Sequence, residues 1–451
     1  MVSRMNRTAI FVSAALLLTA AAGFAVVTRP APLQPPPPPV LTKTLGPVTL
    51  EARLSHGAVP SRGGELYAEY TVTVASGALP TMNGPVSMAV VLDVSGSMQG
   101  EKLADAKKAA HRLVDLLGAD DELSFITFGD VVDRRPLWKM TPENKAATHA
   151  AIDGVIASGA TLLSGGLEAG ADALRDANGS RRLVLISDGR PTMGVVEPRA
   201  LATLARRAHD ANVTVTALGV GSDYDGLLTQ QLAEWGGGMY GYLKDGGALE
   251  EVLGQELVAA RTPALRNVRL QLDPKRLRID EVPGRNRDGD TLLLADLRPG
   301  QPTRVLVRLV APGAEEGTRA SLDATLSWSE PASAERHTLF AGLSALAIDD
   351  ERAALAGRDE GLWSRGITAA GHSRMVQAAV ALERGDTRAA DSLFDSARSL
   401  FSQSADALAG EAEVQQLRRD FNQASDGKRK DLARSFEKKA LSDFGRGNEA
   451  Y

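Results

Sequence analysis

Apolar and polar residues follow two different rhythms in the middle of the chain, one typical of buried strands and one typical of helices. Short apolar runs suited to strands that are buried on both faces cover residues 87–93, 122–128, 182–187, 213–219 and 239–243. Helical spacing or a helix-start signal covers residues 102–117, 142–157, 199–212, 227–235 and 248–260. Strands that alternate with helices of this length predict an α/β fold with a doubly wound, mostly parallel sheet.

The segments on both sides of this region alternate apolar and polar residues, as half-exposed strands do. They cover residues 48–54 and 65–74 before it, and 267–272, 276–279, 291–294, 304–310 and 320–328 after it. Two strands cannot bury a face alone, so the early pair needs the later ones. The pattern predicts a flanking β-sandwich that the α/β domain interrupts, with two unrelated β-pieces as the alternative.

Beyond about Ile348 the strand pattern stops, and the chain is predicted to be a C-terminal α-helical region. One apolar stripe at helical spacing contains Met375, Val376, Ala379 and Leu382, and a second stripe at 390–401 follows a turn at 384–386. The two stripes predict antiparallel helical hairpins.

The first 28 residues have the features of an export signal. Arg4 and Arg7 precede an uncharged stretch at residues 8–28, and Arg29 closes it. An apolar stretch of about 20 residues fits either a cleaved signal peptide or a membrane anchor. If the stretch is an anchor, the two arginines before it would keep the N-terminal side cytoplasmic. The rest of the chain is therefore expected in a periplasmic or other extracytoplasmic space, either secreted or anchored to the cytoplasmic membrane.

A proline-rich tract follows, with five consecutive prolines at 35–39, and it predicts a stiff spacer. The predicted organisation is a signal peptide or anchor at 1–28, a linker at 29–45, strands joining the sandwich at 46–84, the α/β domain at 85–261, the sandwich at 262–346 and the helical region at 347–451.

Composition excludes several classes of function. The net charge of -5, without a long basic stretch, argues against a nucleic-acid partner. The chain has no cysteine, which excludes disulfides, thiolate zinc sites, iron–sulfur clusters and a cysteine nucleophile. Its six histidines stand at no spacing typical of zinc binding or of a base for a nucleophile.

Side chains that carry oxygen atoms stand in three of the predicted loops. Asp93, Ser95 and Ser97 follow the strand at 87–93, Thr161 precedes a helix, and Asp188 follows the strand at 182–187. Ligands of an open α/β sheet bind at the carboxyl ends of its strands, so these loops are expected to meet at one edge. Oxygen ligands without histidine or cysteine favour a hard cation, and a set rich in hydroxyls suits Mg²⁺, with Mn²⁺ or Ca²⁺ as alternatives.

These five residues, with Gly96 and Gly189 beside them, resemble the metal-ion-dependent adhesion site (MIDAS) of von Willebrand factor A (VWA) domains. The resemblance implies direct coordination by Ser95, Ser97 and Thr161, while Asp93 and Asp188 act mostly through waters or orient the hydroxyls. It also implies the strand order 3-2-1-4-5-6, with an antiparallel edge strand near 131–138. The segment 100–107 also resembles VWA domains, and the segment 219–240 resembles bacterial A-domain proteins related to the chloride-channel-accessory and inter-alpha-inhibitor heavy-chain group.

An export signal and a metal site without a catalytic set predict a non-enzymatic binding module of the cell envelope. Through the metal it would grip an Asp or Glu of a protein partner. An assembly scaffold acting through the C-terminal helices is the alternative hypothesis. A metal-dependent hydrolase is a third, and its general base would be Asp130 or Glu168, the candidates near the site.

Overall fold

The structure, a computed structural model, describes residues 34–440 apart from 78–84, 189, 222–224, 244–245, 263–264, 331–334, 384, 426–427, 430–431, 434–435 and 437–439. The predicted signal peptide or anchor at 1–28 lies outside the described residues. Among the residues that are described, no helix is long and apolar enough to span a membrane.

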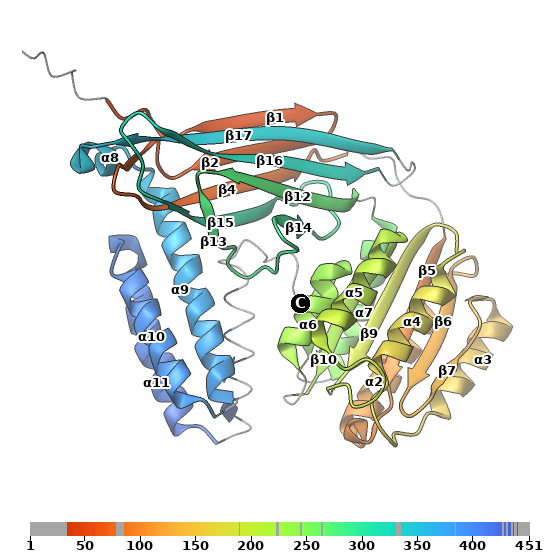
Figure 1. The fold of residues 1–451 in the computed structure, drawn as a ribbon. Helices are drawn as coiled ribbons and strands as arrows, with labels where there is room; N and C mark the ends of the chain where they lie inside the picture. Colours follow the sequence, from red (N-terminus) through yellow and green to blue (C-terminus); the bar gives the residue numbers. More distant parts are fainter. Residues whose placement is uncertain are drawn as a thin grey trace, which may run out of the picture. The chain divides into compact units, whose positions relative to one another are not determined.

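A seven-stranded sheet forms the centre of the α/β domain (Figure 1). Its strands are β5 (Val86–Asp93), β6 (Glu122–Phe128), β7 (Val132–Arg134), β8 (Trp138–Lys139), β9 (Ser180–Ser187), β10 (Val213–Val220) and β11 (Gly237–Leu243). They lie in the order β11-β10-β9-β5-β6-β7, and β8 also pairs with β6. Only β7 and β8 run antiparallel to their neighbour. The mostly parallel sheet, its strand order and its antiparallel edge are thus as expected.

Helices cover both faces of this sheet because its inner strands carry apolar side chains on both sides. Met88, Val90 and Leu92 of β5 pack in one core cluster, and Ala89 and Val91 pack in another on the opposite face. The helices of the first face are α2 (Glu101–Leu116), α3 (Pro142–Asp153) and α7 (Gly246–Arg261). Those of the second are α4 (Leu163–Leu174), α5 (Pro198–Asp210) and α6 (Gly226–Trp235).

Two five-stranded sheets with a shared core form the predicted sandwich. One has the order β1-β2-β4-β15-β13 and the other the order β14-β12-β16-β17-β3. The strands before the α/β domain are β1 (Val40–Leu45), β2 (Val48–Leu54), β3 (Ala58–Pro60) and β4 (Gly64–Val74). Those after it are β12 (Arg266–Lys275), β13 (Arg278–Glu281), β14 (Thr291–Leu293), β15 (Thr303–Ala311), β16 (Arg319–Ser329) and β17 (Arg336–Ile348). Because β4 pairs with β15 along its length, the early and late strands build one sandwich.

The start of the sandwich differs from the sequence prediction. Residues 40–45, expected to belong to the linker, form β1 and pair with β2. The proline tract before them contacts the sandwich, because the Leu54 N–H donates to the carbonyl of Pro39 at 3.1 Å. A Cβ atom at Gly57 would lie only 1.9 Å from the carbonyl oxygen of Pro36. The tract from Pro35 to Pro39 thus contacts the sandwich at Pro36 and Pro39 instead of projecting as a free spacer.

Helices follow the sandwich, as the loss of the strand pattern predicts. They are α8 (Glu351–Ala356), α9 (Glu360–Glu383), α10 (Thr387–Phe401) and α11 (Ala409–Gln423). Met375 and Ala379 of α9 share a core cluster with Ala390 and Phe394 of α10, so the two apolar stripes form the expected hairpin. The carboxylate of Asp386 caps α10 by accepting the N–H of Ala389.

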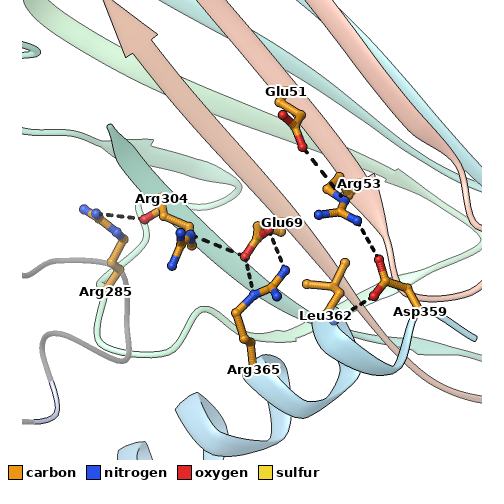
Figure 2. A network of polar contacts seen from close by, with 8 residues as sticks. All are labelled: Glu51, Arg53, Glu69, Arg285, Arg304, Asp359, Leu362 and Arg365. Carbon is orange, nitrogen blue, oxygen red and sulfur yellow. Dashed lines mark hydrogen bonds and ion pairs between the residues drawn. The ribbon is translucent and has the colours of Figure 1, made fainter. Parts of the chain in front are cut away.

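A buried carboxylate joins α9 to the sandwich. Glu69 of β4 accepts hydrogen bonds from Arg365 of α9 at 2.9 and 3.0 Å, and Arg304 of β15 lies 3.4 Å away, as Figure 2 shows. The side chain of Glu69 is 5% exposed. Beside it, Asp359 pairs with Arg53 at 2.8 Å and accepts the N–H of Leu362 at the start of α9. The first turns of α9 are therefore fixed by charge pairing as well as by apolar packing.

The Glu69→Gln variant should lose about 1.5–3 kcal/mol of unfolding free energy, because both arginines lose the charge that they face. Glu51→Gln is the matched control. The Glu51 carboxylate is exposed and lies 3.9 Å from Arg53, so its loss should cost less than about 1 kcal/mol. Urea unfolding measures both variants. Equal stability of the two would contradict the role given to Glu69.

A second prediction concerns the stability of the protein at acidic pH. His56 is 1% exposed, and burial, helped by the positive charge of Arg358, lowers its pKa from 6.5 to about 4. Between pH 6.5 and about pH 4, His56 is protonated in the unfolded chain but stays neutral in the folded chain. Stability should therefore fall as pH drops from 6.5 to about 4, by up to about 3 kcal/mol from this group alone. The variant His56→Phe, which keeps an aromatic ring against Trp363, should flatten the pH dependence of unfolding in this window, and an unaltered slope would refute the assignment.

Candidate metal centre

Asp93, the last residue of β5, organises the first loop of the candidate site. Its side chain is fully buried. One carboxylate oxygen accepts the N–H of Ser95 at 2.8 Å, and the other accepts the hydroxyl of Ser187 at 2.6 Å. Burial raises the pKa of Asp93, the hydrogen bonds from Ser187 and Ser95 lower it, and the neighbouring charge of Asp188 raises it. The loop therefore closes on a buried acidic group that links the ends of β5 and β9.

Two hydroxyls and a second carboxylate continue from this loop. The Oγ atoms of Ser95 and Ser97 lie 3.0 Å apart, and the Ser97 hydroxyl donates to Oδ1 of Asp188 at 2.7 Å. Asp188 follows the end of β9 and is buried, whereas Ser97 is exposed. Four of the five predicted residues thus lie in one hydrogen-bonded cluster that reaches the surface at Ser97.

The loop of Thr161 is attached to the first loop through the backbone. The Gly96 N–H donates to the carbonyl of Gly159 at 3.1 Å, and the Ser158 N–H donates to that of Val94 at 2.8 Å. Thr161 is buried, and its own N–H donates to the hydroxyl of Thr192 at 2.9 Å. The structure therefore places the fifth predicted residue on a loop that is bound directly to the other four.

Asp130 supports this loop from beneath. Its Oδ1 accepts the N–H of Ala160 at 2.7 Å. Gly159 has φ of +78°, a conformation that favours glycine, and a Cβ atom there would lie 2.1 Å from Oδ2 of Asp130. The glycine thus lets the loop turn closely over the carboxylate.

The two general-base candidates lie in different surroundings. Asp130 is engaged with the backbone of the Thr161 loop. Glu168 is exposed on α4 and lines a groove against α5, together with Arg207 and Ala211.

The chemistry of this cluster fits a hard cation. Within the described part of the chain, no group of three or more histidine, aspartate and glutamate side chains is arranged to hold a metal. A site here would depend on its hydroxyls, which suit Mg²⁺ better than a softer metal. Two buried carboxylates beside three hydroxyl-bearing residues also supply the negative charge that a buried cation needs.

Four supporting residues were not predicted from the sequence in these roles. They are Ser187, Lys102, Thr192 and Asp130. Lys102, in the first turn of α2, pairs its Nζ with Oδ2 of Asp188. Its place in the segment Gly100-Glu101-Lys102, just after the first loop, was the one available signal. The other contacts join residues that are about 30 or more positions apart in the sequence.

The α/β fold of this region agrees with a family comparison. Residues 87–255 match the family model described as the von Willebrand factor type A domain. This region is a VWA domain. The match covers β5 through most of α7, so the sandwich and the C-terminal helices lie outside it.

Curated relatives of the VWA domain are similar over less than half of this chain. The Escherichia coli protein YfbK is 27% identical over 201 residues, which cover 43% of this chain and 34% of YfbK. Bovine (Bos taurus) inter-alpha-trypsin inhibitor heavy chain H1 is 30% identical over 192 residues, covering 40% of this chain and 21% of that protein. An Arabidopsis thaliana protein described as the E3 ubiquitin-protein ligase WAV3 is 31% identical over 32% of this chain and 20% of its own. The chain thus spans between 20% and 34% of the length of these relatives.

Solved structures share the fold beyond the VWA domain. The Sulfolobus acidocaldarius ArnB paralog VWA2 aligns with a TM-score of 0.58 and 16% identity, covering 87% of this chain and 98% of that one. A von Willebrand factor type A protein from Catenulispora acidiphila aligns with a TM-score of 0.60 and 17% identity, covering 84% and 91%. The similarity therefore includes most of the chain.

The turn at Gly159 yields a prediction with a matched control. Gly159→Ala and Gly385→Ala both place a side chain at φ of +78°, but a Cβ atom at Gly385 would meet nothing within 4 Å. Both should be destabilised by about 1–2 kcal/mol from backbone strain. Gly159→Ala should lose about 1 kcal/mol more, because it displaces Asp130 from Ala160.

Thermal unfolding of the single variants and of Gly159→Ala in an Asp130→Ala background separates the two effects. The excess cost should vanish in that background. An excess that persists would show that the contact with Asp130 is not its cause.

Proposed function

We propose that the VWA domain binds one divalent cation, Mg²⁺ with Mn²⁺ or Ca²⁺ as alternatives, and uses it to grip an Asp or Glu side chain of a protein partner. Ser95, Ser97 and Thr161 would hold the ion through their hydroxyls, and Asp93 and Asp188 would orient these hydroxyls or act through waters. When bound, the ion supplies a positive charge with room for a further oxygen ligand. The single observation that carries the proposal is the hydrogen-bonded cluster of Ser95, Ser97 and the two buried aspartates.

The surroundings of the cluster favour a protein partner. Large apolar side chains are exposed on the loops that carry or contact the site, namely Val131, Ile156, Met193, Val195 and Val196. Backbone bonds tie these loops to the site: Met193 N–H donates to the carbonyl of Thr161, and Leu162 N–H donates to that of Gly129. Exposed apolar side chains on the loops beside the site are consistent with a surface that meets a protein partner.

The same geometry favours binding over the other two hypotheses. A hydrolase would need a general base that is free to act near the ion, and Asp130 is engaged with the Thr161 loop. For a scaffold that acts through its C-terminal helices, the apolar face of α9 would have to be available. Leu362, Trp363 and Ile367 of that helix are instead buried in the core. We therefore assign the binding role to the VWA domain, and we place the protein outside the cytoplasm on the strength of its N-terminal sequence.

Calorimetric titration of Mg²⁺ tests the proposal. Ser97→Ala removes an exposed hydroxyl of the cluster, and we expect it to weaken Mg²⁺ binding at least about tenfold, as the loss of metal-site partners does. Ser399→Ala, at an exposed position of α10, is the matched control and should bind as the wild type does. Circular dichroism verifies that both variants are folded. Equal affinity of Ser97→Ala and the wild type would contradict the assignment of this site.

A further inference from the structure

A lysine lies inside the candidate metal centre, where a second positive charge is unexpected. Lys102 pairs its ammonium group with Oδ2 of Asp188, while the Ser97 hydroxyl occupies Oδ1. The carboxylate of Asp188 is fully buried, and the side chain of Lys102 is 27% exposed. Asp188 thus has a partner on each carboxylate oxygen.

The stem of Lys102 packs against Gly221, just after the end of β10. Gly221 follows β10 with φ of +74°, and a Cβ atom there would lie 2.8 Å from Cε of Lys102. The absence of a side chain at Gly221 leaves room for the stem of the lysine. Lys102 is therefore held between the end of β10 and Asp188, in contrast to the exposed Lys108 on the same helix.

The lysine changes the charge that a cation would meet. Asp93 and Asp188 offer two carboxylates, and Lys102 offsets one of them. A divalent ion bound here would be less fully neutralised than in a site without the lysine. Coulomb repulsion from the ammonium group should weaken metal binding, and the uncancelled charge should strengthen the attraction for an incoming carboxylate.

The lysine also gives the buried carboxylate of Asp188 a positive partner within the chain. A buried carboxylate without a positive partner is costly, and removing one member of such a pair is strongly destabilising. The ion pair with Lys102 offsets this cost for Asp188. The metal-free domain should therefore be folded with its loops in place.

We propose that Lys102 tunes two affinities of the site. It lowers the affinity of the site for the metal, and it raises the affinity of the metal-loaded site for a carboxylate. This inference rests on the proposed function, since it presupposes that the cluster binds a divalent cation. Lys102 acts here as a tuning residue and is not itself a ligand.

Calorimetry on Lys102→Met, with Lys108→Met as the matched control, measures the first half of the proposal. We expect Lys102→Met to bind Mg²⁺ about three- to tenfold more tightly than the wild type, and Lys108→Met to be unchanged. In EDTA, Lys102→Met should melt at a lower temperature than the wild type, and saturating Mg²⁺ should raise its melting temperature by more. If Lys102→Met does not fold without metal, Lys102→Gln, which can still donate a hydrogen bond to Asp188, replaces it in the same comparison.

Acetate is the probe for the second half. NMR titration of the Mg²⁺-loaded proteins should give acetate binding about three- to tenfold weaker in the lysine variant than in the wild type. Unchanged or weaker Mg²⁺ affinity, or unchanged acetate affinity, would overturn the role of Lys102 and leave the metal site standing. A wild type that binds no Mg²⁺ would overturn both proposals.

Discussion

The burial of both faces of the central parallel sheet is the constraint from which the site follows. Alternate side chains of β5 face two different cores, so a slip of β5 by one residue would move each set into the core that is packed for the other. Its register with β9 pairs Leu92 with Ile186 and so brings Asp93 beside Ser187. The hydrogen bond between these two residues, and the nearness of Asp188 to Ser97, are consequences of that register. The apolar core thereby positions polar groups that take no part in it.

Much of the fold could be predicted because its strands are regular. The bounds of β2 and β6 agree with the sequence pattern at both ends, because the apolar residues of these strands are all buried. β1 could not be found in this way, because five of its six residues are exposed and its existence depends on pairing with β2. β17 was also missed as a strand. It is rich in alanine, and small residues such as Ala341 and Ala345 give a weak strand signal although they are buried.

The candidate site, too, could be predicted from the sequence only in part. Its five expected residues stand at strand ends or beside loop glycines, where a short motif in sequence is enough to mark them. The residues that support them act across the fold: Ser187 reaches Asp93 from the neighbouring strand, and Asp130 reaches Ala160 from the end of β6. Contacts of this kind depend on side-chain reach between segments that are distant in sequence, and no local pattern encodes them. Lys102 is an intermediate case, since its position beside the motif is visible whereas its pairing with Asp188 is not.

Taken together, the structure describes a domain whose loops are held in place by internal hydrogen bonds and by a lysine, so that a cation would meet a formed site. The most direct test is a crystal structure of the protein grown with Mn²⁺, whose anomalous scattering locates the ion. The account predicts one strong peak within coordination distance of the hydroxyl oxygens of Ser95, Ser97 and Thr161, at about 2.0–2.4 Å. A fully occupied peak elsewhere, with these hydroxyls still bonded only to one another and to Asp188, would contradict it.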